Sequence, residues 1–147
     1  MNKPRTIVGM SIVTSNDAAQ NQNTIGKLWE AFLQSSIKEQ LKNISSPSIF
    51  AVYSDYENGY MGKYKITIGY AVDDLSAIPK ELSVVVIPSG NYKVYHSKSQ
   101  DVQDIINTWQ TIWQLDPKLF LRSFVADFEE YTSDGKMTIN IAYAQAI

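Results

Sequence analysis

Residues 64–70 read YKITIGY and residues 137–143 read MTINIAY, and the two stretches align without a gap. Both alternate apolar and polar side chains in the manner of a strand with one buried face. A Gly-Lys pair lies just before or at the start of each stretch, as expected for the turn of a β-hairpin. We interpret the match as an internal duplication, although hairpin composition alone can produce a match this short.

The sequence around these two hairpins predicts two units with the same order of elements: strand, helix, strand, strand. In the first unit we expect strands at 6–15, 48–57 and 63–72 and a helix at 24–43. In the second we expect strands at 82–97, 120–132 and 136–145, with a kink at Pro88-Ser89-Gly90, and a helix that follows SKSQDVQD and ends at Asp116-Pro117. The hairpin alignment, extended backwards, places Val52 over Val125 and Tyr56 over Glu129.

Both predicted helices carry apolar residues at helical spacing. The apolar positions are Ile25, Leu28, Trp29, Phe32, Ile37 and Leu41 in the first helix and Val102, Ile105, Trp109, Ile112 and Trp113 in the second. We therefore predict an α+β fold in which duplicated strand-helix-strand-strand units form one antiparallel sheet with two helices on one face. Residues 1–147 form a single domain on this interpretation, with pseudo-repeats at about 6–72 and 82–145.

Composition excludes several kinds of site. The 147-residue chain has no cysteine and one histidine, so disulfides, thiolate zinc sites and multi-histidine metal sites are excluded. A net charge of −2 gives no electrostatic signature for nucleic acid or an anionic membrane. We find neither a membrane-spanning segment nor a signal peptide, and expect a cytoplasmic protein without metal or cofactor.

The segment DFEEY, residues 127–131, places three carboxylates among aromatic side chains. Strand alternation puts Asp127, Glu129 and Tyr131 on one face, and Glu130 on the other. These acids are either solvated at a strand end or include one that faces a groove between the helices. An unpaired carboxylate in such a groove costs several kcal/mol and calls for a hydroxyl or aromatic partner, or a cationic ligand.

Aromatic residues are plentiful, with three Trp, nine Tyr and five Phe. Trp109 and Trp113 lie one turn apart on the second predicted helix, and Trp29 has a similar place on the first. They are either ordinary core residues or the walls of an aromatic cleft, whose ring faces attract cations. Tyr53, Tyr131 and Tyr143 can add rings and hydroxyl groups to such a cleft.

Five motifs occur in an order that resembles the gyrase-inhibitor-like (GyrI-like) effector-binding domains. They are KLWEAF, FAVYSDYENGYMGKYKITIG, VVVIPSGNYKVY, NTWQTIW and ADFEEY, and the resemblance covers about residues 6–145. Such domains are the ligand-sensing modules of AraC-type and MerR-type bacterial regulators. They also occur as free-standing proteins, some on mobile gene cassettes.

The resemblance implies two pseudo-symmetric units with a ligand cleft between them. Members of the family bind lipophilic, often cationic and planar compounds between aromatic side chains, above a glutamate on the penultimate strand. Glu129 matches this glutamate, Trp113 a helical tryptophan and Tyr143 a tyrosine of the last strand. The candidate ligand-binding residues are Glu129, Trp29, Tyr53, Trp109, Trp113, Tyr131 and Tyr143.

No helix-turn-helix precedes the first predicted strand, so we expect no direct binding of nucleic acid. The leading hypothesis is a free-standing protein that binds a lipophilic or cationic small molecule, without catalytic residues. One alternative is a hydrolase of strained electrophilic toxins that uses Glu129 as general base. Another is a protein partner, either DNA gyrase, as the family's name suggests, or a separate regulator.

Overall fold

The computed structural model describes residues 3–15, 18–57, 62–75, 78–115 and 121–144. Its elements are, in chain order, β1 (Arg5–Ser15), α1 (Ala18–Gln34), α2 (Ile37–Gln40), β2 (Ile49–Ser54), β3 (Lys63–Val72), β4 (Ser83–Ile87), β5 (Tyr92–His96), α3 (Val102–Trp113), β6 (Ala126–Tyr131) and β7 (Met137–Ala142). The predicted hairpin partners are therefore β2–β3 and β6–β7, and the long first strand is β1.

The strands described form one seven-stranded sheet in the order β4-β1-β3-β2-β6-β7-β5, and all neighbours are antiparallel. This confirms the predicted α+β class with a single antiparallel sheet. The run β1-β3-β2 has the same arrangement as the run β5-β7-β6, and the two runs meet where β2 pairs with β6. Two units of equal order produce such a sheet, and their origin in a duplication stays a prediction.

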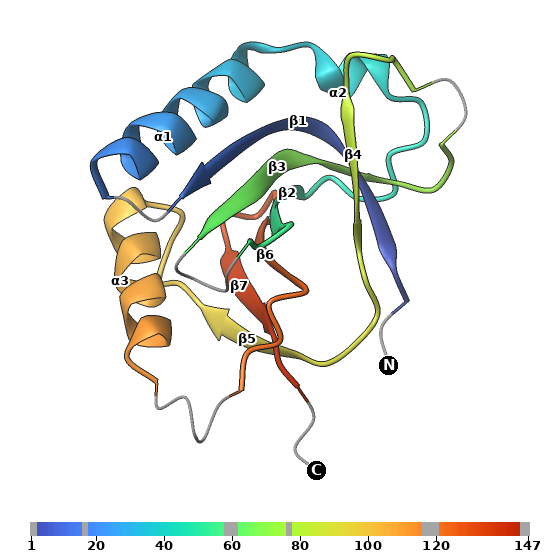
Figure 1. Ribbon diagram of the computed structural model, residues 1–147. Helices are drawn as coiled ribbons and strands as arrows, with labels where there is room; N and C mark the ends of the chain where they lie inside the picture. Colours follow the sequence, from blue (N-terminus) through green and yellow to red (C-terminus); the bar gives the residue numbers. More distant parts are fainter. Residues whose placement is uncertain (1–2, 16–17, 58–61, 76–77, 116–120, 145–147) are drawn as a thin grey trace.

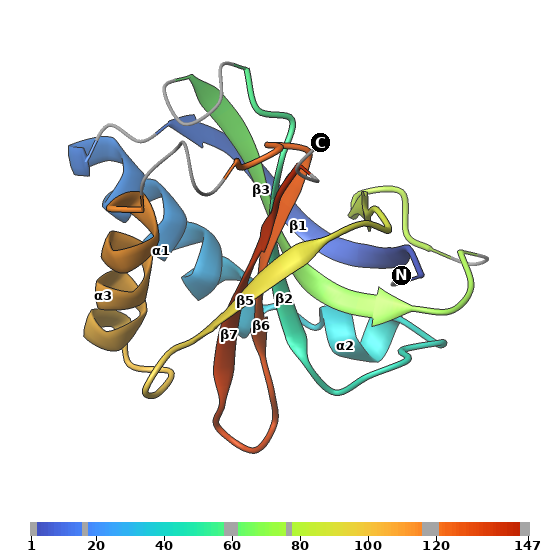
Figure 2. The same cartoon turned by 90° about the horizontal axis from the view of Figure 1, so that it is seen from below.

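The two long helices, α1 and α3, lie side by side on the same face of the sheet (Figures 1 and 2). Leu28 and Phe32 of α1 pack on Val8, Ile66 and Ile68 of the sheet, and Ile112 of α3 packs on Met137, Ile139 and Ile141. The predicted face of α3 is only partly right. Ile105 is half-buried, whereas Val102 and Trp113 at the two ends of the helix are exposed.

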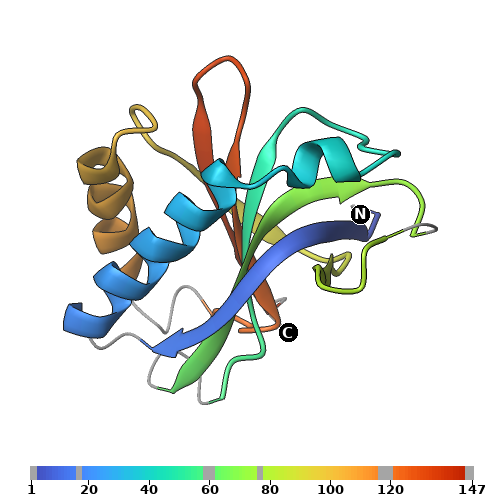
Figure 3. The same cartoon turned by 90° about the horizontal axis from the view of Figure 1, so that it is seen from above.

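The stretch 82–97 is not one kinked strand, as predicted, but two strands at opposite edges of the sheet. β4 pairs with β1, and β5 pairs with β7. Pro88 has no N–H to donate to a ladder, and Gly90 adopts a φ of 153°, so pairing stops between the two strands. Because only residues 88–91 join the two edges, the sheet has to curl strongly, as Figure 3 shows.

The curl brings strands β1 and β3 very close together at one point. Gly9 and Gly69 are directly opposed, and a Cβ at Gly9 would lie 1.8 Å from the Ile68 carbonyl oxygen. A Cβ at Gly69 would lie 2.1 Å from the Val8 carbonyl oxygen. Glycine is therefore required at both positions by the close approach of the two backbones.

The predicted helix at 24–43 begins earlier and breaks at Ser35. Both the amide and the hydroxyl of Ser35 donate to the Phe32 carbonyl, at 3.1 and 2.6 Å. These bonds satisfy one of the carbonyl groups left free at the end of α1. The short helix α2 follows, so the apolar residue Ile37 belongs to a separate turn.

Three predicted strands are shorter in the structure. Residues Asp55 and Phe124 have φ values of 54° and 55°, which end β2 and delay the start of β6 to Ala126. β7 ends at Ala142. The turn at 133–135 is confirmed, with Gly135 at a φ of 89°. The other predicted hairpin turn and the predicted helix stop at Asp116-Pro117 lie, in whole or in part, outside the described residues.

The register overturns both of the equivalences expected between the two hairpins. Tyr53 pairs with Ile66 and Glu129 pairs with Ile139, and the hairpin alignment matches Ile66 to Ile139. Glu129 therefore corresponds to Tyr53, and by the same register Phe128 corresponds to Val52. The expected matches of Tyr56 with Glu129 and of Val52 with Val125 are both wrong. The connection between β2 and β3 is three residues longer than the one between β6 and β7, and an ungapped alignment cannot include that difference.

Truncation of Phe32 tests the packing of α1 on the sheet. Phe32→Ala removes a buried ring and should lower the free energy of unfolding by ~3–5 kcal/mol. Leu33→Ala, at the adjacent exposed position, should change it by less than ~0.5 kcal/mol. Urea denaturation of both variants makes the comparison, and equal losses would show that the helix face is misassigned.

Candidate ligand-binding site

Glu129 lies in the middle of the sheet, where β6 is paired on one side with β2 and on the other with β7. Its register partners are Ala51 and Ile139, and its side chain points to the face that α1 and α3 cover. Glu129 is only 3% exposed. The alternative of a solvated strand end is therefore wrong for this carboxylate.

Three neutral groups donate hydrogen bonds to the Glu129 carboxylate. The indole Nε1 of Trp109 and the hydroxyl of Tyr53 donate to Oε2, at 2.7 and 3.0 Å. The hydroxyl of Tyr131 donates to Oε1 at 2.7 Å. A carboxylate has about four acceptor positions, so most of them are filled by the protein itself.

The rings that carry these donors belong to one continuous aromatic cluster. Trp29 of α1 contacts Tyr131 edge to face, with 4.9 Å between ring centroids, and Tyr53 contacts Trp109 in the same way at 5.3 Å. Trp113 stacks on Trp109 at 5.9 Å and is 57% exposed. The cluster therefore extends from the buried carboxylate along α3 to the protein surface.

A second buried carboxylate on the same strand is neutralised. Asp127, which is 0% exposed, accepts a hydrogen bond from the Tyr56 hydroxyl and forms an ion pair of 2.6 Å with Arg122. Its other oxygen accepts the Ala142 amide at 2.9 Å. Within the described ranges, the ion pairs found are Arg122–Asp127 and Arg5–Glu130, and neither includes Glu129.

Burial without a counter-charge changes the ionisation of the cluster. Desolvation raises the pKa of Glu129 above its ordinary value, and the hydrogen bonds from Trp109, Tyr131 and Tyr53 partly oppose that rise. Burial also raises the pKa of Tyr53 and of Tyr131, and the nearby Glu129 charge adds to both shifts. The tyrosines therefore remain neutral donors, and the cluster holds a single titrating group.

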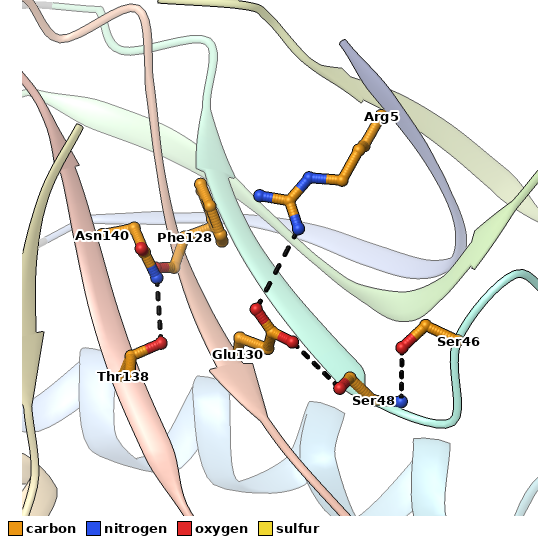
Figure 4. Close-up of polar contacts among 7 residues, drawn as sticks. All are labelled: Arg5, Ser46, Ser48, Phe128, Glu130, Thr138 and Asn140. Atoms are coloured by element: carbon orange, nitrogen blue, oxygen red, sulfur yellow. Dashed lines mark hydrogen bonds and ion pairs between the residues drawn. The ribbon is translucent and has the colours of Figure 1, made fainter. Parts of the chain in front are cut away.

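Glu130 lies on the opposite face of the sheet, as predicted. It accepts the Ser48 hydroxyl at 3.0 Å and lies 4.0 Å from the Arg5 guanidinium. The guanidinium in turn lies over the Phe50 and Phe128 rings, at 5.3 and 4.8 Å from their centroids. Figure 4 shows Glu130 between Arg5 and Ser48.

The structure brings together six of the seven predicted site residues. Tyr53, Trp109 and Tyr131 donate hydrogen bonds directly to Glu129. Trp29 contacts the ring of Tyr131. Trp113 is linked through Trp109 and lies at the exposed end of the cluster.

Tyr143 has a different position from the one expected. It follows β7, forms an isolated bridge with Arg122, and lines a separate hollow of about 230 Å³ with Pro88, Tyr92, Val125 and Ala142. The resemblance implied a tyrosine of the last strand in the cleft, whereas β7 ends at Ala142 and Tyr143 lies just beyond it.

The sequence did not identify Arg122 as the counter-ion of Asp127. Arg122 lies before β6 in the chain, and Phe124, between them, has a positive φ. The Arg122 guanidinium lies over the Phe124 ring, 4.3 Å from its centroid. Spacing along a predicted strand gives no signal for such a contact. In the part of the chain that the structure describes, no group of three potential metal ligands occurs and no helix is long and apolar enough to cross a membrane.

The pH dependence of stability tests the unpaired charge. Because the pKa of Glu129 is raised in the folded state, its ionisation costs stability. This cost is absent below the unfolded value of 4.5, grows as pH rises from there to the folded pKa, and is constant above it. Glu129→Gln should therefore be at least as stable as the wild type at pH 7. Its advantage should disappear near pH 4, as measured by urea denaturation across this pH range.

Comparison with known proteins gives relatives over nearly the whole chain. The Bacillus subtilis (strain 168) protein YobU, named as a candidate transcriptional regulator, is 29% identical over 134 residues, which cover 89% of this chain and 83% of YobU. An integron cassette protein from the mobile metagenome of Vibrio cholerae has the same fold, with a TM-score of 0.79 and 22% identity over 97% of this chain and 92% of that chain.

A second solved structure, that of SAV2435 bound to tetraphenylphosphonium, has a TM-score of 0.77 and 19% identity over 97% of this chain and 90% of that chain. The family model described as "Integron-associated effector binding protein" matches residues 2–144. These matches confirm the resemblance to GyrI-like effector-binding domains. The chain belongs to the family of integron-associated effector binding proteins.

Proposed function

We propose that this protein binds a lipophilic cation, planar or otherwise rich in aromatic rings, at the aromatic cluster over Glu129. The observation that carries the proposal is a buried carboxylate with three neutral hydrogen-bond donors and no cation in contact with it among the described residues. Asp127, two residues away on the same strand, has Arg122 in that place. A cationic ligand would give Glu129 a positively charged partner, as Arg122 does for Asp127.

The energetics favour a cation over a neutral compound. An isolated buried carboxylate costs several kcal/mol, of which neutral hydrogen bonds recover a part. A cation near Glu129 would recover more, because charges interact strongly where water is excluded. The ring faces of Trp29, Trp109 and Trp113 add cation–π attraction and apolar area.

Access to the carboxylate requires a side chain to move, because Glu129 is 3% exposed. Trp109 is the group we expect to move. Its helix, α3, is held on the sheet by few contacts, since Ile112 is its one buried residue. A single hydrogen bond joins the Trp109 indole to Glu129. Trp113, stacked on Trp109 and exposed, offers a ring on which a ligand can first dock.

A relative's ligand is consistent with this chemistry. SAV2435 was solved with tetraphenylphosphonium, a cation whose charge is surrounded by aromatic rings and which carries no hydrogen-bond donor. Such a cation would leave the donors on Tyr53 and Tyr131 in place and would interact with Glu129 through charge alone. We therefore choose it as the probe.

We favour binding over hydrolysis for a geometric reason. A general base needs a free carboxylate oxygen in contact with a water molecule. Both oxygens of Glu129 already accept hydrogen bonds from the protein, and the carboxylate is buried.

Charge removal at Glu129 tests the proposal. Glu129→Gln should weaken the binding of tetraphenylphosphonium by ~1.5–3 kcal/mol, the Coulomb attraction between two unit charges roughly 6–10 Å apart at an effective dielectric constant of about 20. Triphenylphosphine oxide, a neutral compound with similar rings, should lose much less, because ring contacts remain. Titration calorimetry or quenching of tryptophan fluorescence gives both affinities.

Glu130→Gln is the matched control, since the neighbouring carboxylate lies on the opposite face and contacts Ser48 and Arg5. It should leave both affinities unchanged within about a factor of two. Equal effects at positions 129 and 130, or equal losses for the cation and the neutral compound, would refute a role for the Glu129 charge in binding.

Binding of the cation should also depend on pH. The pKa of Glu129 is raised by burial in the empty protein, and a bound cation lowers it again. Binding should therefore release protons and become weaker as pH falls through the raised pKa. Calorimetry in two buffers of different ionisation enthalpy measures the proton count, and Glu129→Gln should release none at this site.

A further inference from the structure

The strand β4 is an edge of the sheet and has no charged side chain. Its five residues read SVVVI, and its other edge faces no further strand in the described part of the sheet. Val84 is 43% exposed and Val86 is 50% exposed. These two valines lie on the helix-covered face, opposite Val8 and Thr6 of β1, but α1 packs on β1 and β3.

The opposite edge of the same sheet is built differently. Strand β5 carries Lys93 and His96 within five residues, and both are exposed. Charged residues on an edge strand oppose pairing with another chain, and natural proteins commonly place them there. The sheet therefore has one edge with such residues and one without.

We propose that β4 is a self-association edge, at which two copies of this chain pair antiparallel about Val85. In that register Val84 of each copy lies opposite Val86 of the other, and Ser83 lies opposite Ile87. The exposed valines then become cross-strand pairs of β-branched residues, which stabilise a sheet. The two seven-stranded sheets join into one continuous sheet with a two-fold axis.

A second copy is the occupant that the sequence of β4 fits. The strand is self-complementary under antiparallel pairing, because its small and apolar residues face one another. It has no charge, so the two copies bring no like charges together. A charged or strongly polar partner strand would find no complementary group along SVVVI.

Five residues on each side form a small contact, so the dimer should be weak and dependent on concentration. The pairing uses the edge of the sheet and leaves the cluster over Glu129 untouched. Dimer formation therefore does not depend on the proposed ligand site, and its test can fail while ligand binding holds.

Sedimentation velocity over a range of protein concentration tests the dimer, with the full chain and no ligand. The wild type should shift from monomer toward dimer as concentration rises. Val84→Lys places a charge next to the centre of the contact, opposite Val86 of the other copy, and should weaken association by roughly tenfold or more. Val94→Lys adds the same charge to the exposed face of β5 and should associate like the wild type.

Cysteine substitution tests the register, because the chain has no native cysteine. Directly opposed residues in antiparallel strands have Cα atoms ~4.5–5.5 Å apart, which a disulfide can span. A mixture of Val84→Cys and Val86→Cys proteins should therefore cross-link under mild oxidation into the mixed dimer. Either variant alone should cross-link poorly, since like positions are offset by two residues.

A wild type that stays monomeric at all accessible concentrations would overturn the proposal. So would dimers that Val84→Lys leaves intact, because the contact would then lie elsewhere. Cross-linking of the single cysteine variants as readily as the mixture would exclude the register about Val85. Circular dichroism of each variant confirms that a loss of association does not come from unfolding.

Discussion

The pairing of β2 with β6 is the contact on which the site depends. It joins the two halves of the sheet and brings Tyr53 and Glu129, 76 residues apart in sequence, within one hydrogen bond. Because both strands are central, side chains at this seam are shielded by sheet below and helices above. A carboxylate placed here loses water on all sides, so its environment must be supplied by neighbouring side chains or by a ligand.

The two buried carboxylates of β6 illustrate two solutions to the same desolvation cost. Asp127 forms an ion pair with the Arg122 guanidinium, which neutralises its charge, and accepts hydrogen bonds from a hydroxyl and a backbone amide. Glu129 has three neutral donors and a raised pKa. The first arrangement is typical of a structural ion pair. The second leaves a buried carboxylate without a cationic partner inside a wall of rings, which is typical of a functional site.

The sequence predicted the fold well where periodicity was strong, and less well where the chain changed direction. The hairpin strands, the helix face with Leu28 and Phe32, and the face shared by Glu129 and Tyr131 all follow from spacing. The separation of 82–97 into strands at opposite edges did not, because a proline and a glycine indicate a break but not where the chain goes next. The position of Arg122 beside Asp127 and the three-residue difference between the hairpin connections are tertiary features with no local signature.

On the proposed function, the hydrogen bond between Trp109 and Glu129 limits how tightly a ligand can bind at the cluster. In the empty protein Trp109 donates to Glu129, so a ligand that displaces the indole has to replace that hydrogen bond as well as find room among the rings. A cation replaces it with a charge–charge interaction, whereas a neutral compound of the same shape does not. On the proposed function, the hydrogen bond that closes the site would also set its selectivity, since it raises the energetic cost of binding for every ligand and a cation recovers more of that cost.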